Sequence, residues 1–182
     1  MEILYWVVGS VIAVISFVAL VLFVYITLQG EGDVRILTGE RSALTCEYVD
    51  KQKAVFSMIV PFYNGGKQED IILDAFARVL LPQEQFDMAT VTPLLERPER
   101  RRSDNYLEAF IVKIKERGEF ILTLTVEAKD GAMLEDVLQN IVDMTIDVYW
   151  TAVGRCAPRI LKDDLTVLLE EFQDSAAKEI MR

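Results

Sequence analysis

The chain contains no histidine, and only two cysteines, Cys46 and Cys156, stand among its 182 residues. Without histidine it has neither a Ser-His nor a Cys-His nucleophile pair, and it lacks the commonest general base and metal ligand. The two cysteines have no CxxC spacing, so they could form one bridge in an oxidising compartment or remain two buried thiols. These absences argue against most enzyme classes.

Motifs that hold nucleotides or metals are missing as well. The turn Asn64-Gly65-Gly66-Lys67 lacks the G-x-x-x-x-G-K-S/T pattern of a phosphate loop. The acidic residues have no EF-hand spacing, so we expect no metal and no cofactor; the carboxylates considered are Asp143, Asp147, Asp163, Asp164, Glu170 and Glu171. The net charge of −10 repels phosphate backbones, which disfavours nucleic-acid binding.

What the sequence does contain is a long apolar run, residues 3–29, in which only Tyr5 and Tyr25 carry an ionisable group. The run is apolar on every face, so it is no amphipathic surface helix. About 26 helical residues extend roughly 39 Å, enough for a hydrocarbon core of about 30 Å. It is too long for a signal-peptide core and no Lys or Arg precedes it, which favours an uncleaved signal anchor. We therefore predict that residues 1–30 form a single-pass transmembrane helix in a plasma or inner membrane.

The flanks of this run carry the signals of a membrane interface. Tyr5 and Trp6 at one end and Tyr25 at the other stand where interfacial aromatics are expected. Arg35 and Arg41 follow the run and no basic residue precedes it, so the positive-inside rule leans toward a cytoplasmic domain. Two arginines against none leave the side of the membrane open.

Alternation of apolar and polar residues recurs after the anchor and predicts strands. The expected strands cover residues 34–37, 44–48, 54–62, 106–115, 120–126, 145–151 and 165–169. Residues 70–81 fit a strand or a helix face, and the flanking Gly-Gly turn and Pro82 favour a strand. Residues 134–141 have the i, i+3, i+4, i+7 spacing of a short helix. Residues 115–119, which include Gly118, are expected to form a hairpin turn.

These elements predict a mainly β protein. We expect residues 31–172 to form an immunoglobulin-like antiparallel β-sandwich with one short inserted helix. Residues 173–182 are expected to be a helical or frayed tail. Gly30 to Gly32 form almost no linker, so the domain is expected to sit close to the bilayer surface.

Two local motifs invite a functional interpretation. Four arginines crowd one loop and could contact acidic lipid headgroups or an acidic partner: Arg97, Arg100, Arg101 and Arg102. Pro98 and the neighbouring acids Glu96, Glu99 and Asp104 favour an exposed loop that partly neutralises itself.

The second motif, Ser57-Met58, resembles the serine-methionine pair of membrane-anchored signal peptidases. The resemblance implies a serine nucleophile activated by a lysine, for which Lys113 and Lys115 are the candidates. The sequence departs from that family because Ile59 and Val60 both precede Pro61, where the family has one residue, and because the family's Gly-Asp boxes are missing.

The sequence therefore favours a non-enzymatic interaction or assembly module that a short tether concentrates near a protein partner at the membrane. One alternative is a small subunit of a larger membrane complex, whose helix packs through Gly9, Ser10 and Ala13. The Ser-Lys peptidase is the other.

Overall fold

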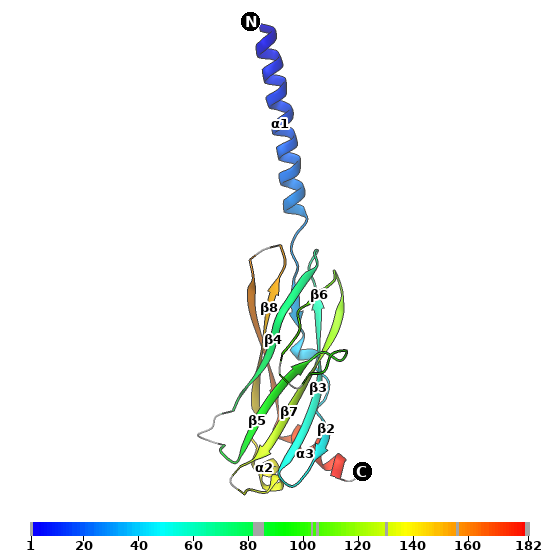
Figure 1. Cartoon of the computed structure of the whole chain (residues 1–182), viewed down its shortest axis with the longest axis vertical. Coiled ribbons are helices and arrows are strands. Elements are labelled where there is room, and N and C mark those ends of the chain that lie inside the picture. The colour runs from blue at the N-terminus through cyan, green and yellow to red at the C-terminus, as the bar shows by residue number, and fades with distance from the viewer. Residues whose placement is uncertain are drawn as a thin grey trace.

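The computed structural model describes residues 2–81, 86–102, 104, 106–129, 131–155 and 157–180. A long helix projects from one end of an elongated β domain, and two short helices lie at the opposite end (Figure 1). Cys156 lies outside the described residues, so the two alternatives for the cysteines, one bridge or two buried thiols, both stay predictions.

The first element is α1 (Glu2–Leu28), and its segment Tyr5–Leu28 is long and apolar enough to cross a membrane. The described side chains of this segment are exposed around the whole helix, because no other element of the chain packs against it. Its few hydroxyls bond within the helix, as Ser10 donates to the carbonyl of Trp6 at 2.8 Å. A helix in the predicted place is thus confirmed, and its insertion into a membrane stays a prediction.

The rest of the chain forms two antiparallel sheets. Sheet A contains β1 (Val34–Ile36), β2 (Thr45–Val49), β3 (Lys53–Asn64), β7 (Arg117–Ala128) and β5 (Ala89–Glu96). Sheet B has the order β6 (Phe110–Val112), β4 (Asp70–Leu80), β8 (Met144–Val153) and β9 (Arg159–Val167). Strands β1 and β2 pair with successive halves of the same edge of β3, and the short 3₁₀ helix η1 (Thr38–Glu40) separates them. The mainly β prediction is confirmed, as is the strand over 70–81.

The core lies between the two sheets because each long strand alternates its side chains between an inner and an outer face. On β3 the inner residues Phe56, Met58 and Val60 are buried, while outer residues such as Lys53 pair with charges on β7. The ring of Phe62 on β3 lies 5.6 Å from that of Phe110 on β6, which joins the two sheets. Every connection from β3 to β8 passes from one sheet to the other, so the sheets cannot separate as independent units.

Two helices close the end of the domain farthest from α1 (Figure 1). The helix α2 (Leu134–Asn140) matches the predicted short helix and connects β7 to β8. The C-terminal helix α3 (Leu169–Ile180) includes residues 173–180 of the segment predicted as a helical or frayed tail, and residues 181–182 lie outside the described residues. It packs on β2, with Phe172 fully buried and its ring 5.0 Å from Phe56 in an edge-on contact.

The sequence pattern missed β5. The strand contains Pro93, which lacks the N–H that a central strand donates to its neighbours. It is tolerated because β5 is an edge strand that pairs only with β7.

The predicted hairpin turn over 115–119 is wrong. The chain turns over residues 113–116, where Lys115 takes a φ of 59°, and Gly118 already belongs to β7. A side chain at Gly118 would overlap the Phe62 ring, so this glycine serves packing and not the turn. The flanking strands are not partners either, since β6 pairs with β4, and only Phe110–Val112 of the predicted 106–115 strand is formed.

The last predicted strand, over 165–169, is displaced along the chain, because β9 already begins at Arg159. It ends at Val167, and Leu169 begins α3 instead of continuing the alternation. The backbone N–H of Leu169 donates to the Asp143 carboxylate at 2.8 Å, which satisfies one free donor at the start of the helix.

A buried carboxylate lies on the outer face of sheet B. Asp147 is only 3% exposed, because the side chains of Tyr149 and Lys162 cover it. The Tyr149 hydroxyl donates to it at 3.0 Å, and the Lys162 ammonium lies 2.9 Å away. Bonding to Lys162 lowers the pKa of Asp147 and, in return, Asp147 raises the pKa of Lys162.

Asp147→Asn is therefore expected to reduce stability at neutral pH and to flatten its dependence on acid. A carboxyl whose folded pKa lies below its unfolded value of about 3.9 contributes stability above about pH 4 and loses it as the pH falls further. Urea unfolding of the full chain in detergent between pH 2 and 7 measures this. Asp164→Asn, an exposed neighbour on β9, is the matched control, and an equal flattening in both variants would refute the assignment.

Candidate functional site: the junction between helix and sheets

Residues 29–33 join α1 to β1, and their geometry decides how the domain is held. The helix ends because Gly30 takes a φ of +68°, a left-handed conformation that glycine adopts without strain. Its Cα faces the aliphatic stem of Lys67, 3.1 Å from where a Cβ would stand, so the chain leaves the helix already in contact with the β3–β4 turn.

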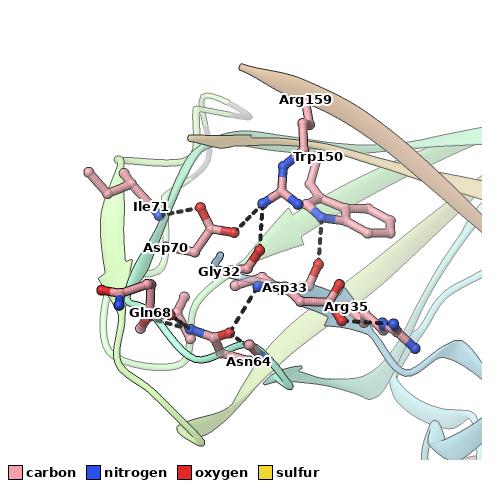
Figure 2. A network of polar contacts seen from close by, with 12 residues as sticks. Gly32, Asp33, Arg35, Asn64, Gln68, Asp70, Ile71, Trp150 and Arg159 are labelled. Carbon is pink, nitrogen blue, oxygen red and sulfur yellow. Dashed lines mark hydrogen bonds and ion pairs between the residues drawn. The ribbon is translucent and has the colours of Figure 1, made fainter. Parts of the chain in front are cut away.

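The carbonyl groups of this segment are bound by the domain almost one after another. We call this set of contacts the linker clamp. Its donors and acceptors are Gln68 Nε2 to Gln29 O (3.2 Å), Lys67 N to Glu31 O (2.9 Å), Arg159 Nη2 to Gly32 O (3.0 Å), Gly65 N to Asp33 O (2.8 Å) and Trp150 Nε1 to Val34 O (3.3 Å). The donors come from β8, β9 and the β3–β4 turn, so the linker is fixed to both sheets (Figure 2).

Asn64 lies at the centre of the clamp and is fully buried. Its Oδ1 accepts from the backbone N–H groups of Asp33 at 3.1 Å and Gly66 at 2.9 Å. Its Nδ2 donates to the carbonyls of Gln68 at 2.8 Å and Val112 at 3.1 Å. All four hydrogen-bonding positions of the amide are thereby used, which is the condition for burying it without a large penalty.

An ion pair between the buried Asp70 and the half-buried Arg159 also supports the clamp. Asp70 is fully buried, and its Oδ2 accepts from Arg159 Nη2 at 2.6 Å, while its Oδ1 accepts from the Ile71 N–H at 3.2 Å. The same guanidinium nitrogen binds the Gly32 carbonyl, so one arginine links carboxylate and linker (Figure 2). A Cβ on Gly32 would come within 2.7 Å of the Asp70 side chain, so only glycine lets the linker approach this closely.

The arginine loop predicted to contact lipid or a partner is paired largely with itself. Arg97 is bonded to Glu99 at 3.1 Å and stacks over the Phe110 ring at 4.1 Å, and Arg100 binds Glu108. The four arginines lie on the connection between β5 and β6, along the side of the domain rather than at the end nearest α1 (Figure 1).

The remaining two arginines of that loop differ from each other. Arg102 binds Asp104 at 2.6 Å, which lowers the pKa of Asp104 and raises that of Arg102. Arg101 is exposed, and in the described part of the chain it makes no ion pair. Three of the four arginines are thus paired with acidic residues of the same region, and only the Arg101 guanidinium is left to bind a partner. The predicted contact of this loop with lipid or a protein partner stays a prediction.

The serine and lysines of the peptidase interpretation are not brought together. Ser57 lies in the middle of β3 between Thr45 and Thr123 on the neighbouring strands. Lys115 bonds instead to the Gly65 carbonyl at 2.7 Å, beyond the far end of β3. Eight residues of extended chain from Ser57 to Gly65 correspond to about 26 Å, well outside proton-transfer range.

The carboxylates considered as calcium ligands are also dispersed. Asp163 accepts from the Thr38 hydroxyl at 2.8 Å, Glu171 binds Arg41 at 2.9 Å, and Asp143 caps α3. Among the described residues no three acidic or cysteine side chains converge on one point.

The remaining predicted site residues have simple environments. Tyr5, Trp6 and Tyr25 are exposed on α1, at the positions expected of interfacial aromatics. Cys46 is buried on β2, and its thiol donates to the Tyr48 carbonyl at 3.4 Å. Burial raises the pKa of this thiol, which lowers the fraction present as the nucleophilic thiolate.

Sequence reasoning missed the clamp, although one of its parts was visible. The Asn64-Gly65-Gly66 signal correctly marks a turn, but nothing local indicates that this turn binds the linker. Asp70 and Arg159 stand 89 positions apart and their pairing has no sequence signature.

Comparisons with known proteins add a distant likeness of shape. No protein-family model matches this chain, and no curated protein matches it. Among solved structures, it is similar to a Bordetella pertussis protein assigned as ApaA, with 11% identity, a TM-score of 0.43, and coverage of 75% of this chain and 94% of that one.

The GAE domains of two yeast proteins are also similar in shape. That of GGA2p from Saccharomyces cerevisiae has 8% identity, a TM-score of 0.33 and coverage of 75% and 96% of the two chains. That of yeast GGA1 has 8% identity, a TM-score of 0.31 and coverage of 68% and 97%. At such scores the function has to be argued from this chain's own geometry.

Gly66→Ala tests the clamp directly. A Cβ at Gly66 would overlap the backbone of Glu31 and Gly32, and no change of side-chain rotamer can relieve a clash with backbone. We expect the variant to open the clamp and to lose about 1–3 kcal/mol of local stability, the usual penalty of overpacking. Hydrogen exchange at the Gly65 and Lys67 amides should accelerate by about tenfold or more.

The matched control is Gly39→Ala in η1, where a Cβ would meet nothing within 4 Å. It should leave both exchange rates unchanged. Unaltered protection of Gly65 and Lys67 in Gly66→Ala would contradict the clamp.

Proposed function

We propose that this chain is a membrane-tethered, non-enzymatic interaction or assembly module. In this proposal α1 crosses the bilayer once, and the two-sheet domain is held at the membrane surface to meet a protein partner. The observation that carries it is the linker clamp, which binds the carbonyls of Gln29, Glu31, Gly32, Asp33 and Val34 directly after the apolar helix.

The clamp supports the proposal because it restrains a short, glycine-rich linker that would otherwise be flexible. Five free residues of this kind would let the domain wander over roughly 13 Å and rotate relative to the helix. With its carbonyls bound, the linker instead transmits the direction of α1 to the sheets. A domain of fixed orientation near a bilayer meets membrane-bound partners at a raised effective concentration and with one face presented.

We propose that the domain is an immunoglobulin-like β-sandwich, supported by its two facing antiparallel sheets and by connections that cross between them. Such sandwiches present loops at two opposite ends, and here one end is occupied by the clamp.

A second candidate, a small subunit of a larger membrane complex, is favoured by the surface of α1. Gly9, Ser10 and Ala13 leave a shallow hollow beside Tyr5 and Trp6, where another transmembrane helix could approach closely. The two candidates differ in what survives gentle detergent extraction. A stoichiometric partner retained by the wild type and lost in Gly9→Leu would favour the subunit role.

Membrane insertion through α1 is the testable foundation of the proposal. The double variant Ile15→Arg/Val18→Arg places two charges at the middle of the helix, each costing about 2.5–3.5 kcal/mol in a bilayer. The wild type should remain in the membrane pellet after alkaline carbonate extraction, and the variant should move to the supernatant. The matched control Ile15→Leu/Val18→Leu should stay in the pellet, whereas wild-type protein in the supernatant would overturn the proposal.

A further inference from the structure

A groove lies where α2, α3 and the β2–β3 turn meet. Figure 1 shows α2 and α3 at the end of the domain farthest from α1. We call this groove the distal groove; it encloses about 750 Å³, within the range of ligand-binding clefts. Its floor is apolar, formed by Val49, Leu134, Leu138 and Ala176. Met133 stands at its edge with 52% of its surface exposed.

The walls of the groove are held in place, so the site is preformed. The N–H of Leu134 at the start of α2 donates to the Lys51 carbonyl at 3.0 Å. Gln173 on α3 donates to the Leu138 carbonyl on α2 at 3.3 Å. A partner would therefore spend little free energy on ordering the groove.

The charges around the distal groove are mainly negative. Asp50 and Glu135 line it, and α2 and α3 also carry the exposed acids Asp136 and Asp174 against one exposed lysine, Lys178. Among the described residues, the carboxylates of Glu135, Asp136 and Asp174 have no ion-pair partner, unlike those of the arginine loop. Only Lys51 adds a positive charge to the lining.

We propose that the distal groove binds a short cationic amphipathic helix of a partner protein. Apolar side chains spaced one turn apart would enter the floor, and flanking Lys or Arg would meet the unpaired carboxylates. A helix fits because the groove runs between α2 and α3, whose side chains form most of its lining. A second copy of this chain does not fit, since the exposed faces of α2 and α3 are themselves acidic and the chain carries a net charge of −10.

This inference deepens the proposed function and rests on it for the position of the site. β3 alone contains twelve residues. At about 3.3 Å per residue it extends roughly 40 Å, so the groove is displayed well away from the bilayer. With α1 in the bilayer this distance argues against phospholipid headgroups as occupants, and like charge argues further against the anionic ones.

The test uses the full chain in nanodiscs of neutral lipid, with ¹³C-labelled methionine methyl groups as reporters. The probe is a synthetic 14-residue helical peptide of Leu and Lys, and the control peptide has Glu in place of every Lys. We expect the Lys peptide to shift the Met133 methyl resonance saturably, with a Kd of about 10–100 µM. Met58 and Met144, which are 2% and 0% exposed, should shift far less.

Charge reversal checks the specificity. Glu135→Lys/Asp174→Lys should weaken the Lys peptide at least tenfold and create binding of the Glu peptide. The matched control Glu47→Lys/Glu119→Lys reverses two exposed charges on sheet A and should leave the affinity unchanged.

An unshifted Met133 at 1 mM Lys peptide (about 10 times the weakest expected Kd), or equal shifts with the two peptides, would overturn the inference. Both results leave membrane insertion untouched, because carbonate extraction measures α1 alone. Failure of the groove and failure of the tether are therefore distinguishable.

Discussion

The buried amide of Asn64 is the interaction on which the architecture of this chain depends. It is the only side chain of the described residues that simultaneously binds the linker, the β3–β4 turn and the β6 strand. An unpaired amide in this position would cost several kcal/mol, so the three segments form together or not at all. The end of the domain nearest α1 is thereby made cooperative with the helix that enters it.

The Asp70–Arg159 pair adds specificity to this arrangement. Such an ion pair contributes little net stability compared with apolar packing, but removal of Arg159 would leave the fully buried Asp70 carboxylate without its cation, which is destabilising. Because Arg159 also binds the Gly32 carbonyl, the linker can occupy only the position that satisfies the carboxylate. Polar groups thus fix the path of the linker at this end of the domain, while the apolar core between the sheets supplies the stability.

The two ends of the domain have different roles in our proposal, one in attachment to α1 and the other in binding a partner. At one end hydrogen bonds hold the linker, and at the other an apolar groove with unpaired carboxylates faces away from α1. The long strands β3 and β7 connect the ends as a stiff spacer. A flexible tether would capture a partner equally well. In our proposal the rigid connection matters because it sets the direction in which the distal groove faces.

Much of the fold can be predicted from the sequence, since the apolar run of β3, the alternation of β7 and β8 and the helical spacing of α2 are local signals. The errors have physical causes as well. Pro93 argued against a strand in the segment that forms the edge strand β5. Gly118 was interpreted as a turn residue, but it makes room for the Phe62 ring. The clamp escaped entirely because it joins residues far apart in the chain, and no local pattern encodes which buried carboxylate a distant arginine will meet.

The central claim, that the clamp fixes the domain relative to α1, is tested most directly by a distance between the two. Spin labels at Leu20→Cys on α1 and Thr90→Cys on β5, in a Cys46→Ala/Cys156→Ala background, report it by pulsed electron resonance in nanodiscs. A clamped junction predicts a single narrow distance distribution. A broad distribution, spread over the roughly 13 Å that five unrestrained residues allow, would contradict it.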